Sequence, residues 1–264
     1  MLKRILVLVL CLCLLVPLAC AEESAEEAPA RDAETEELLK EFTLKHGSRS
    51  SKKIALTVDD CYKNRREWIT YDVELCKKYG VKMTFFPLDY TGCLSEQYRD
   101  IWQAVLDAGC EIGSHMDRHV RLGNRDKWGM IGGMGRWQEA MDKTLGYRYE
   151  TRWLRPPTGS IANGKYSTRG QIIECLKRYG YDHIVHWEVS ETYSTEKALS
   201  RTQNGSILLF HAQQKDSKFL DKFIPILQEQ GYEMVTVSEL FGYPPPETGG
   251  ELYVYDKKNY EQQK

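Results

Sequence analysis

Short apolar runs alternate with longer amphipathic segments along most of the chain after residue 52. The apolar runs are rich in β-branched and aromatic residues, which is typical of strands, and the amphipathic segments between them are typical of helices. Strands are expected at residues 53–58, 82–87, 110–115, 151–156, 182–187, 205–211 and 232–237. Helices are expected at residues 66–79, 95–108, 134–145, 168–180, 195–203 and 217–230. This alternation predicts βα units around a mostly parallel sheet or barrel.

Residues 1–21 differ from the rest of the chain because a long apolar stretch follows two basic residues. The stretch runs from Ile5 to Val16, and Ala19 and Ala21 form a small-residue cleavage pattern after it. We therefore expect a secretory signal peptide over residues 1–21 and a secreted or cell-envelope protein. An uncleaved anchor and a lipid attached to Cys20 are the alternatives, and only through one of them would the chain contact a membrane.

The remaining chain divides by composition into three parts. Residues 22–52 are rich in Glu, Ala, Ser and Lys with one brief apolar cluster, so we expect a flexible tether there. Residues 53–242 suffice for one substantial core and form a single expected domain, followed by a C-terminal tail at residues 243–264. The formal net charge of -2 gives no basic footprint, which argues against nucleic acid as a partner.

Five of the eight cysteines lie beyond the signal region, at Cys61, Cys76, Cys93, Cys110 and Cys175. An odd number cannot all pair, and several lie inside apolar patterns. We interpret them as small buried hydrophobic residues rather than as a disulfide framework. For Cys61 two hypotheses stay open, a reactive thiol beside a metal site and a buried, inert thiol.

The catalytic groups of a βα barrel lie at the carboxyl ends of its strands. The polar residues at those positions here are Asp59, Asp60, His115, His119, Arg155, the segment 186–191 and His211. These side chains include groups that bind metals, transfer protons and stabilise anions, and they come from five separate expected strands. Chance alone does not easily produce such a gathering.

Two histidines and two adjacent aspartates provide the expected metal site. His115 and His119 are four residues apart, which lets both imidazoles lie on one side of a helical turn. Met116 follows the first histidine, so the HExxH pattern with its own glutamate base is absent and a base must come from another strand. Of Asp59 and Asp60, one is expected to bind the metal and the other to stay free beside it. Surface histidines and a strand-ending turn are the alternative interpretations.

Arg155 and His211 each allow two interpretations. Arg155 precedes two prolines, which stiffen the loop and suit a guanidinium held against a carboxylate, with an exposed arginine in a turn as the alternative. His211 ends the most apolar strand of the chain, where it is either a core residue or a catalytic group at the barrel mouth.

Five short motifs occur in a characteristic order: TVDDC (57–61), HMDRH (115–119), LRPPTG (154–159), HWEVS (186–190) and SILLFH (206–211). In this order and rough spacing the chain resembles the polysaccharide deacetylase family, the NodB homology domain of carbohydrate esterase family 4, over nearly all of residues 53–242. The resemblance implies a distorted (β/α)7 barrel, a divalent metal, expected to be Zn²⁺, and removal of N-acetyl groups from a hexosamine polymer. The expected substrate is an N-acetylated polysaccharide such as peptidoglycan or a chitin-like polymer.

The resemblance also implies a role for each matching residue. Its metal ligands fall on Asp60, His115 and His119. Asp59 corresponds to the general base, Arg155 to the arginine that orients this base, and His211 to the general acid. The backbone N–H of Thr158 corresponds to the group that helps to bind the oxyanion.

Four positions depart from the family pattern, and they bear on substrate choice and rate. Val58 stands in place of Phe, Cys61 in place of Gly, and Thr158 in place of an aromatic residue. Ser190 stands where the family has the Asp that pairs with the catalytic histidine. Two other functions therefore stay open: a non-catalytic glycan-binding protein that keeps the fold and the metal, and a metal-dependent hydrolase of another amide or ester.

The serine at position 190 leads to an expectation for the general acid. Without a carboxylate partner, His211 is expected to lose its proton at lower pH. Glu188 or Glu191 would prevent this if either supplied the missing negative charge, since both lie in the same segment.

Overall fold

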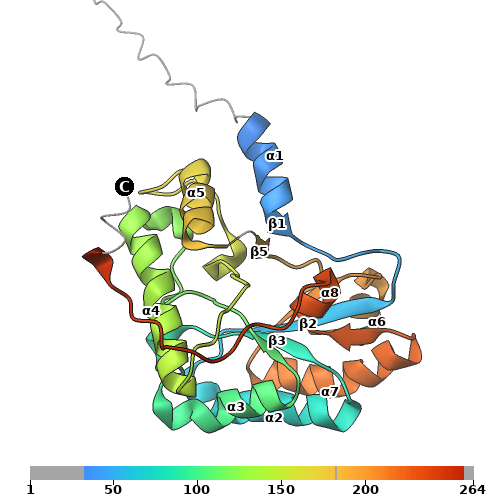
Figure 1. Ribbon diagram of the computed structural model, residues 1–264. Helices are drawn as coiled ribbons and strands as arrows, with labels where there is room; N and C mark the ends of the chain where they lie inside the picture. Colours follow the sequence, from blue (N-terminus) through green and yellow to red (C-terminus); the bar gives the residue numbers. More distant parts are fainter. Residues whose placement is uncertain (1–32, 182, 259–264) are drawn as a thin grey trace, which may run out of the picture. The chain divides into compact units, whose positions relative to one another are not determined.

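A computed structural model of the protein describes residues 33–181 and 183–258 (Figure 1). The expected signal peptide, residues 1–21, lies outside the described residues. None of the helices in the described ranges is long and apolar enough to cross a membrane.

The centre of the fold is a parallel sheet built around β2. Its strands are β2 (Lys53–Asp59), β3 (Met83–Phe86), β4 (Glu111–Ile112), β6 (Ile207–His211) and β7 (Glu233–Val235). β2 pairs with β3, β6 and β7, and β3 pairs with β4. A second parallel pair consists of β1 (Thr43–Leu44) and β5 (Ile184–Val185). Strands buried on both faces explain why these runs are apolar throughout rather than alternating.

Three parallel bridges close this sheet into a barrel. Leu154 pairs with Ser114, just after β4, and with Ile184 in β5, while Val189 pairs with Leu208 in β6. The expected strand at residues 151–156 is thus reduced to one bridging residue, since the prolines that follow it have no N–H to donate to a ladder. The expected distorted (β/α)7 barrel is confirmed.

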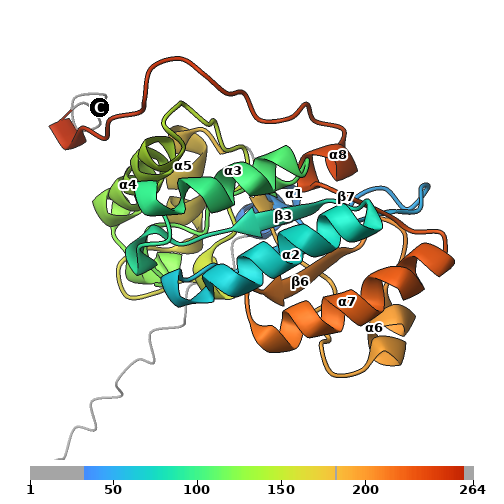
Figure 2. The same cartoon turned by 90° about the horizontal axis from the view of Figure 1, so that it is seen from below.

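Helices surround the barrel (Figures 1 and 2). They are α2 (Arg66–Tyr79), α3 (Arg99–Asp107), α4 (Lys127–Leu145), α5 (Arg169–Tyr179), α6 (Thr195–Arg201), α7 (Gln214–Glu229) and α8 (Val237–Phe241). Short 3-10 turns lie at Lys63–Arg65, Asp89–Thr91, Glu96–Tyr98, Leu122–Asn124 and Pro157–Gly159. α4 begins seven residues before the expected start, because the Asp126 side chain accepts a hydrogen bond from the Gly129 N–H at 2.6 Å and caps the helix there.

The described part of the segment before β2, which begins at residue 33, packs on the barrel and there corrects the expectation of a tether over residues 22–52. Residues 22–32 lie outside the described residues. The helix α1 (Ala33–Phe42) of the described part leads directly into β1, and Phe42 is buried among apolar residues of α5 and β5. The carbonyl of Leu44 accepts a hydrogen bond from the His186 N–H at 2.7 Å. The brief apolar cluster of this segment therefore finds a partner surface that its composition alone does not reveal.

The chain after α8 returns along α4. Thr248 pairs with Tyr149 in an antiparallel bridge, and Tyr255 lies against the glycines of α4. A Cβ atom on Gly135 would lie 2.3 Å from the ring of Tyr255, so a side chain at that position would displace the tail. The described part of the expected tail is thus packed on the domain.

The five cysteines of the described residues, Cys61, Cys76, Cys93, Cys110 and Cys175, are buried, and none of them forms a disulfide there. Their interpretation as small buried hydrophobic residues is confirmed.

Candidate metal centre and catalytic site

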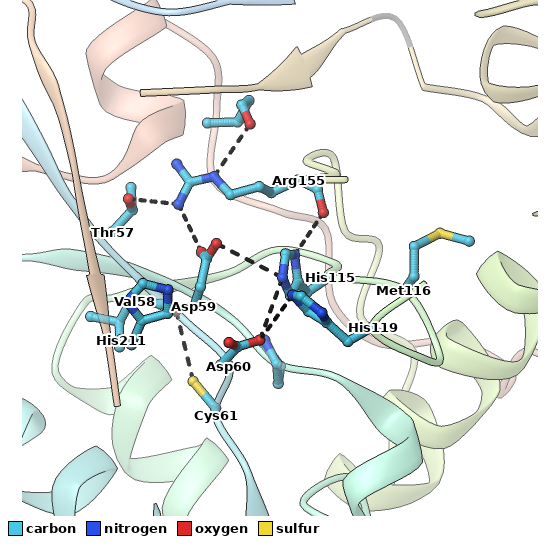
Figure 3. Close-up of polar contacts among 12 residues, drawn as sticks. Thr57, Val58, Asp59, Asp60, Cys61, His115, Met116, His119, Arg155 and His211 are labelled. Carbon is cyan, nitrogen blue, oxygen red and sulfur yellow. Dashed lines mark hydrogen bonds and ion pairs between the residues drawn. The ribbon is translucent and has the colours of Figure 1, made fainter. Parts of the chain in front are cut away.

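Side chains from several strands meet at the carboxyl ends of the barrel strands (Figure 3). β2 ends at Asp59 and β6 ends at His211, and these two residues are paired in register. Asp60, Met116 and Thr158 all have positive φ angles, of 52°, 70° and 64°. Such backbone conformations are unfavourable for residues with a Cβ atom and concentrate at functional sites.

Asp60, His115 and His119 form a compact set of metal-binding groups. Their ligand atoms all lie within 4.8 Å of one another. Asp60 Oδ1 lies 3.6 Å from His115 Nε2 and 3.8 Å from His119 Nε2. The histidines lie on a bend rather than on the expected helical turn, and the positive φ of Met116 brings their ring centroids to 5.5 Å.

The protonation state of His115 suits metal binding. Its Nδ1 lies 2.8 Å from the carbonyl oxygen of Arg155, and because a carbonyl only accepts, Nδ1 carries the hydrogen. The lone pair of Nε2 therefore faces Asp60. Burial lowers the pKa of His115, which keeps the imidazole neutral, although Asp59 and Asp60 act in the opposite direction.

Asp60 provides the test of whether a cation fits this set. Its Oδ1 is buried and accepts no hydrogen bond within the described residues. A buried carboxylate oxygen that faces the lone pair of His115 and the ring nitrogen of His119 without a hydrogen bond is unfavourable, and a cation between the three groups would compensate for this. His119 is 37% exposed at its side chain, which leaves one side of the set open. The residues present thus fit a divalent cation with an accessible coordination position.

Asp117, which the sequence analysis did not identify, anchors the bend between the two histidines. It is buried, and its carboxylate lies 2.7 Å from Arg125 Nη1 and 2.7 Å from Arg136 Nη2. Arg136 lies on α4, so the bend is tied to a helix. The only sequence signal was a charged residue inside the HMDRH motif, where a solvent-exposed position was equally compatible.

Asp59 and Arg155 form a buried ion pair beside the metal-binding set. Arg155 Nη1 lies 2.7 Å from Asp59 Oδ1 and also donates to Thr57 Oγ1 at 2.8 Å. The guanidinium is completely buried, which excludes the alternative of an exposed arginine in a turn. The other oxygen of Asp59, Oδ2, lies 3.9 Å from His115 Nε2 and faces the candidate metal centre.

His211 has a carboxylate partner, but it comes from a different element than expected. Asp216, in the first turn of α7, has its Oδ2 3.3 Å from His211 Nδ1 and accepts the backbone N–H of His211 at 2.8 Å. This contact with Asp216 raises the pKa of His211 above its ordinary value, against the opposing effect of burial. The expectation that His211 loses its proton early is therefore wrong.

Neither of the two glutamates considered as substitutes performs this role. Glu188 binds Arg49 at 2.5 Å and Ser206 at 2.9 Å, and Glu191 accepts the backbone N–H of Tyr193 at 2.7 Å. Ser190 itself is exposed. The segment 186–191 thus contributes no acid to His211.

Thr158 and Cys61 complete the residues singled out from the sequence. No group of the described residues accepts a hydrogen bond from the Thr158 N–H, so this donor is available to a substrate oxygen. Cys61 is completely buried, and burial raises the pKa of its thiol well above its ordinary value. These properties favour the buried, inert alternative for Cys61.

Comparison with known proteins places this geometry in context. Residues 46–184 match the family model described as polysaccharide deacetylase. The chain is 30% identical over 199 residues to a bifunctional xylanase/deacetylase from Pseudobutyrivibrio xylanivorans, a match that covers 74% of this chain and 31% of that protein. It is also 30% identical over 205 residues to the peptidoglycan-N-acetylglucosamine deacetylase PgdA of Listeria monocytogenes, covering 74% of this chain and 40% of that protein. The chain spans about a third to two fifths of the length of these relatives.

A solved structure with a similar fold is a CE4 family pseudoenzyme from Bacillus anthracis. Its TM-score is 0.64 at 20% sequence identity, and the match covers 76% of this chain and 69% of that one. This likeness concerns the fold of the barrel alone.

Proposed function

Because this chain belongs to the polysaccharide deacetylase family, we propose that it is a metal-dependent hydrolase that removes N-acetyl groups from hexosamine glycans such as peptidoglycan. One observation carries the proposal: the buried, unpaired oxygen of Asp60 faces two imidazoles beside the ion pair of Asp59 and Arg155. The proposal includes action outside the cytoplasm, which the signal pattern of residues 1–21 supports.

The residues of the site divide the chemistry of amide hydrolysis among them. A divalent cation held by Asp60, His115 and His119, for which Zn²⁺ is the best match to one carboxylate and two imidazoles, would supply Lewis-acid polarisation of the acetyl carbonyl. Asp59, oriented by Arg155, accepts the proton of the attacking water.

Two further groups act on the charge that develops during the reaction. The Thr158 N–H donates to the oxyanion of the tetrahedral intermediate. His211, which Asp216 keeps protonated to higher pH, gives its proton to the departing amine, and acetate and an amino sugar leave.

A second candidate is a glycan-binding protein that has lost turnover. Cys61 and Ser190 favour it, because both depart from the pattern of active family members. The Asp216–His211 contact argues against it, since it restores the acid that Ser190 lacks. A third candidate, hydrolysis of another amide or ester, rests on the fact that such a site polarises any carbonyl.

One assay separates these candidates. Acetate release is measured from N-acetylglucosamine oligomers, peptidoglycan and O-acetylated xylan, with and without a chelator. We expect chelator-sensitive release from the N-acetylated glycans. Binding of a glycan without release of acetate identifies the non-catalytic protein. Release of acetate only from xylan contradicts the proposed substrate class. Cleavage of other amides without release from any of these three substrates contradicts it as well.

A further inference from the structure

A groove of about 830 Å³ lies between the N-terminal segment and the loop after Thr158. Residues 36–46 form one wall of this groove, and residues 159–162 form another. We call it the N-terminal groove. Its volume lies within the range of small-ligand sites, roughly 300–1,000 Å³. The family match begins only at residue 46, so this chain's own N-terminal segment provides the first wall.

The N-terminal groove adjoins the loop that carries Thr158. Gly159, which lines it, directly follows Thr158, whose N–H is available to an oxyanion. His186 also lines it, and its Nε2 lies 2.7 Å from the Gly159 carbonyl oxygen. The carbonyl of His186 in turn accepts from Arg155 Nη2 at 3.2 Å. A sugar bound in the groove would therefore neighbour a sugar whose acetyl group is at the metal centre.

The backbone of the first wall is fixed on both sides of Lys45. Before it, the Leu44 carbonyl accepts the His186 N–H at 2.7 Å, and Leu44 pairs with Val185. After it, His46 forms an antiparallel bridge with Ser206. Lys45 itself lines the groove with an exposed side chain, and its backbone is held at this wall by the contacts on either side.

The charges that line the groove do not cancel. Both of its acids are already neutralised, Glu36 by Arg169 and Glu188 by Arg49. Lys45, by contrast, forms no ion pair within the described residues. The pKa of His186 is lowered first by burial, then by the charge of Arg155 and, to a smaller extent, by that of Lys45, so Lys45 acts on a residue that lines the groove. An anionic group would find an uncompensated cation here.

We propose that the N-terminal groove is a subsite for a sugar that carries a carboxylate, adjacent to the hexosamine that loses its acetyl group. This inference rests on the proposed function and narrows its substrate class. A muramic acid residue of peptidoglycan has such a carboxylate on its lactyl ether, whereas chitin-like polymers are neutral. Lys45 is then a specificity-determining residue that contacts no reacting atom.

The test compares two probes that differ only in charge. One is the disaccharide of glucosamine and N-acetylmuramic acid, and the other is the same disaccharide with its lactyl carboxylate reduced to an alcohol. Calorimetry with the metal-loaded full chain is expected to show about tenfold tighter binding of the acid. Lys45→Gln should remove most of this preference, and Lys45→Glu should reverse it. Lys222→Gln, at an exposed position of α7, is the matched control and should leave the affinities for both disaccharides unchanged.

Equal affinity of the unmodified chain for acid and alcohol would overturn the subsite, as would an unchanged preference in Lys45→Glu. Melting curves verify that each variant folds. Acetate release from N-acetylglucosamine oligomers is measured separately and tests the proposed function alone. Release with equal affinities therefore rejects only the subsite, whereas a preference for the acid without any release rejects only the proposed catalysis.

Discussion

Asp59 and Asp60 are adjacent in the chain yet have different surroundings. Asp59 is the last residue of β2 and is held by Arg155, whereas Asp60 has a φ of 52° and turns out of the strand toward two histidines. This backbone turn allows both carboxylates to lie at the same site, which simple alternation along a strand would prevent. The two carboxylates thus have different neighbours, which is the basis for the different roles that we propose for them.

Substitution of Asp60 is expected to weaken metal binding, whereas substitution of Asp59 is expected to lower the rate of catalysis. Asp60→Asn should weaken metal binding by about 100-fold or more, because it replaces an anionic ligand by a neutral amide. Asp59→Asn should keep the metal and lower kcat by about 10²- to 10⁴-fold, because it removes the base. Elemental analysis and acetate release measure the two effects. Since Asp59→Asn leaves a buried guanidinium without its partner, thermal melting must show that this variant is folded. Metal-free Asp59→Asn together with fully loaded Asp60→Asn would reverse the assignment.

The contact between Asp216 and His211 predicts a specific pH dependence. A raised pKa keeps the imidazolium present at higher pH, so the proton donor is retained until the pH passes that pKa. Asp216→Asn should lower the pKa and move the alkaline limb of kcat to lower pH. NMR titration of the His211 ring reports this shift independently of activity. Glu188→Gln, whose carboxylate binds Arg49, is the control and should leave the limb in place. An unchanged titration in Asp216→Asn would remove the proposed role of this carboxylate.

Cys61 is expected to be chemically silent in the folded protein. Its thiol is completely buried, and the same burial that raises its pKa keeps the reactive thiolate scarce. A thiol-directed reagent should therefore leave both activity and the mass of the Cys61 peptide unchanged under native conditions, while unfolding should expose the group. Rapid native modification with loss of activity would support the reactive alternative instead.

For single residues, the sequence predicted site residues that lie inside a motif. It did not predict a residue outside the motifs that contacts one of them. The spacing of His115 and His119 and the two adjacent aspartates predicted a metal site, and the family resemblance assigned Asp60 as the third ligand. The structure brings these three side chains together. Asp216 was missed because it lies five residues after His211, beyond the strand and inside the next helix. Only the turn from β6 into α7 brings it back to the imidazole.

At the scale of elements, β2, β3 and β6 were predicted well because burial on both faces leaves continuous apolar runs. The expected strands at residues 110–115, 151–156 and 182–187 are reduced to two residues or to a single bridge. The start of α4 was missed because its first half contains four glycines, which obscure the helical pattern. Those glycines accept close neighbours, including Tyr255 from the chain after α8. These glycines are needed for a contact with a segment far away in the sequence, and the local pattern of residues in the helix gives no sign of that contact.

The helix and strand before β2 are expected to stabilise the domain. Phe42→Ala should lower the free energy of unfolding by about 3 kcal/mol, because it empties a buried site at the junction of α1 and β1. Urea denaturation measures the change. Glu41→Ala, at the exposed neighbouring position, should alter stability by no more than about 0.5 kcal/mol. Equal and small effects of both substitutions would show that residues 33–44 act as the tether first expected.

Two kinds of contact hold the whole molecule together: those within the barrel and those of the terminal segments with the barrel. The sequence predicts the first kind and not the second. The alternation of strands and helices implies a barrel, and a barrel implies that its strand ends converge, so the site was located before its geometry was known. The contact of Arg155 with Asp59 spans the barrel from one side to the other. By contrast, the segments before β2 and after α8 carry few apolar residues, and their packing depends on surfaces that form only after the barrel closes.

Metal binding is expected to stabilise the entire barrel, because the ligands come from the residue after β2 and from the bend after β4, which separate on unfolding. Zn²⁺ at a hundred times its dissociation constant should contribute about 2.7 kcal/mol to the free energy of unfolding. For a domain of this size that corresponds to a rise in Tm of roughly 5–10 °C, which a chelator should abolish. Mg²⁺ should give a much smaller rise, since it prefers oxygen ligands to imidazoles.

The unfolded chain also binds Zn²⁺ through its cysteines, which reduces the rise in Tm. Asp60→Asn keeps those cysteines and lacks the site, so the difference in Tm shift between the two proteins isolates the contribution of the site. Equal shifts in both proteins would place the metal elsewhere.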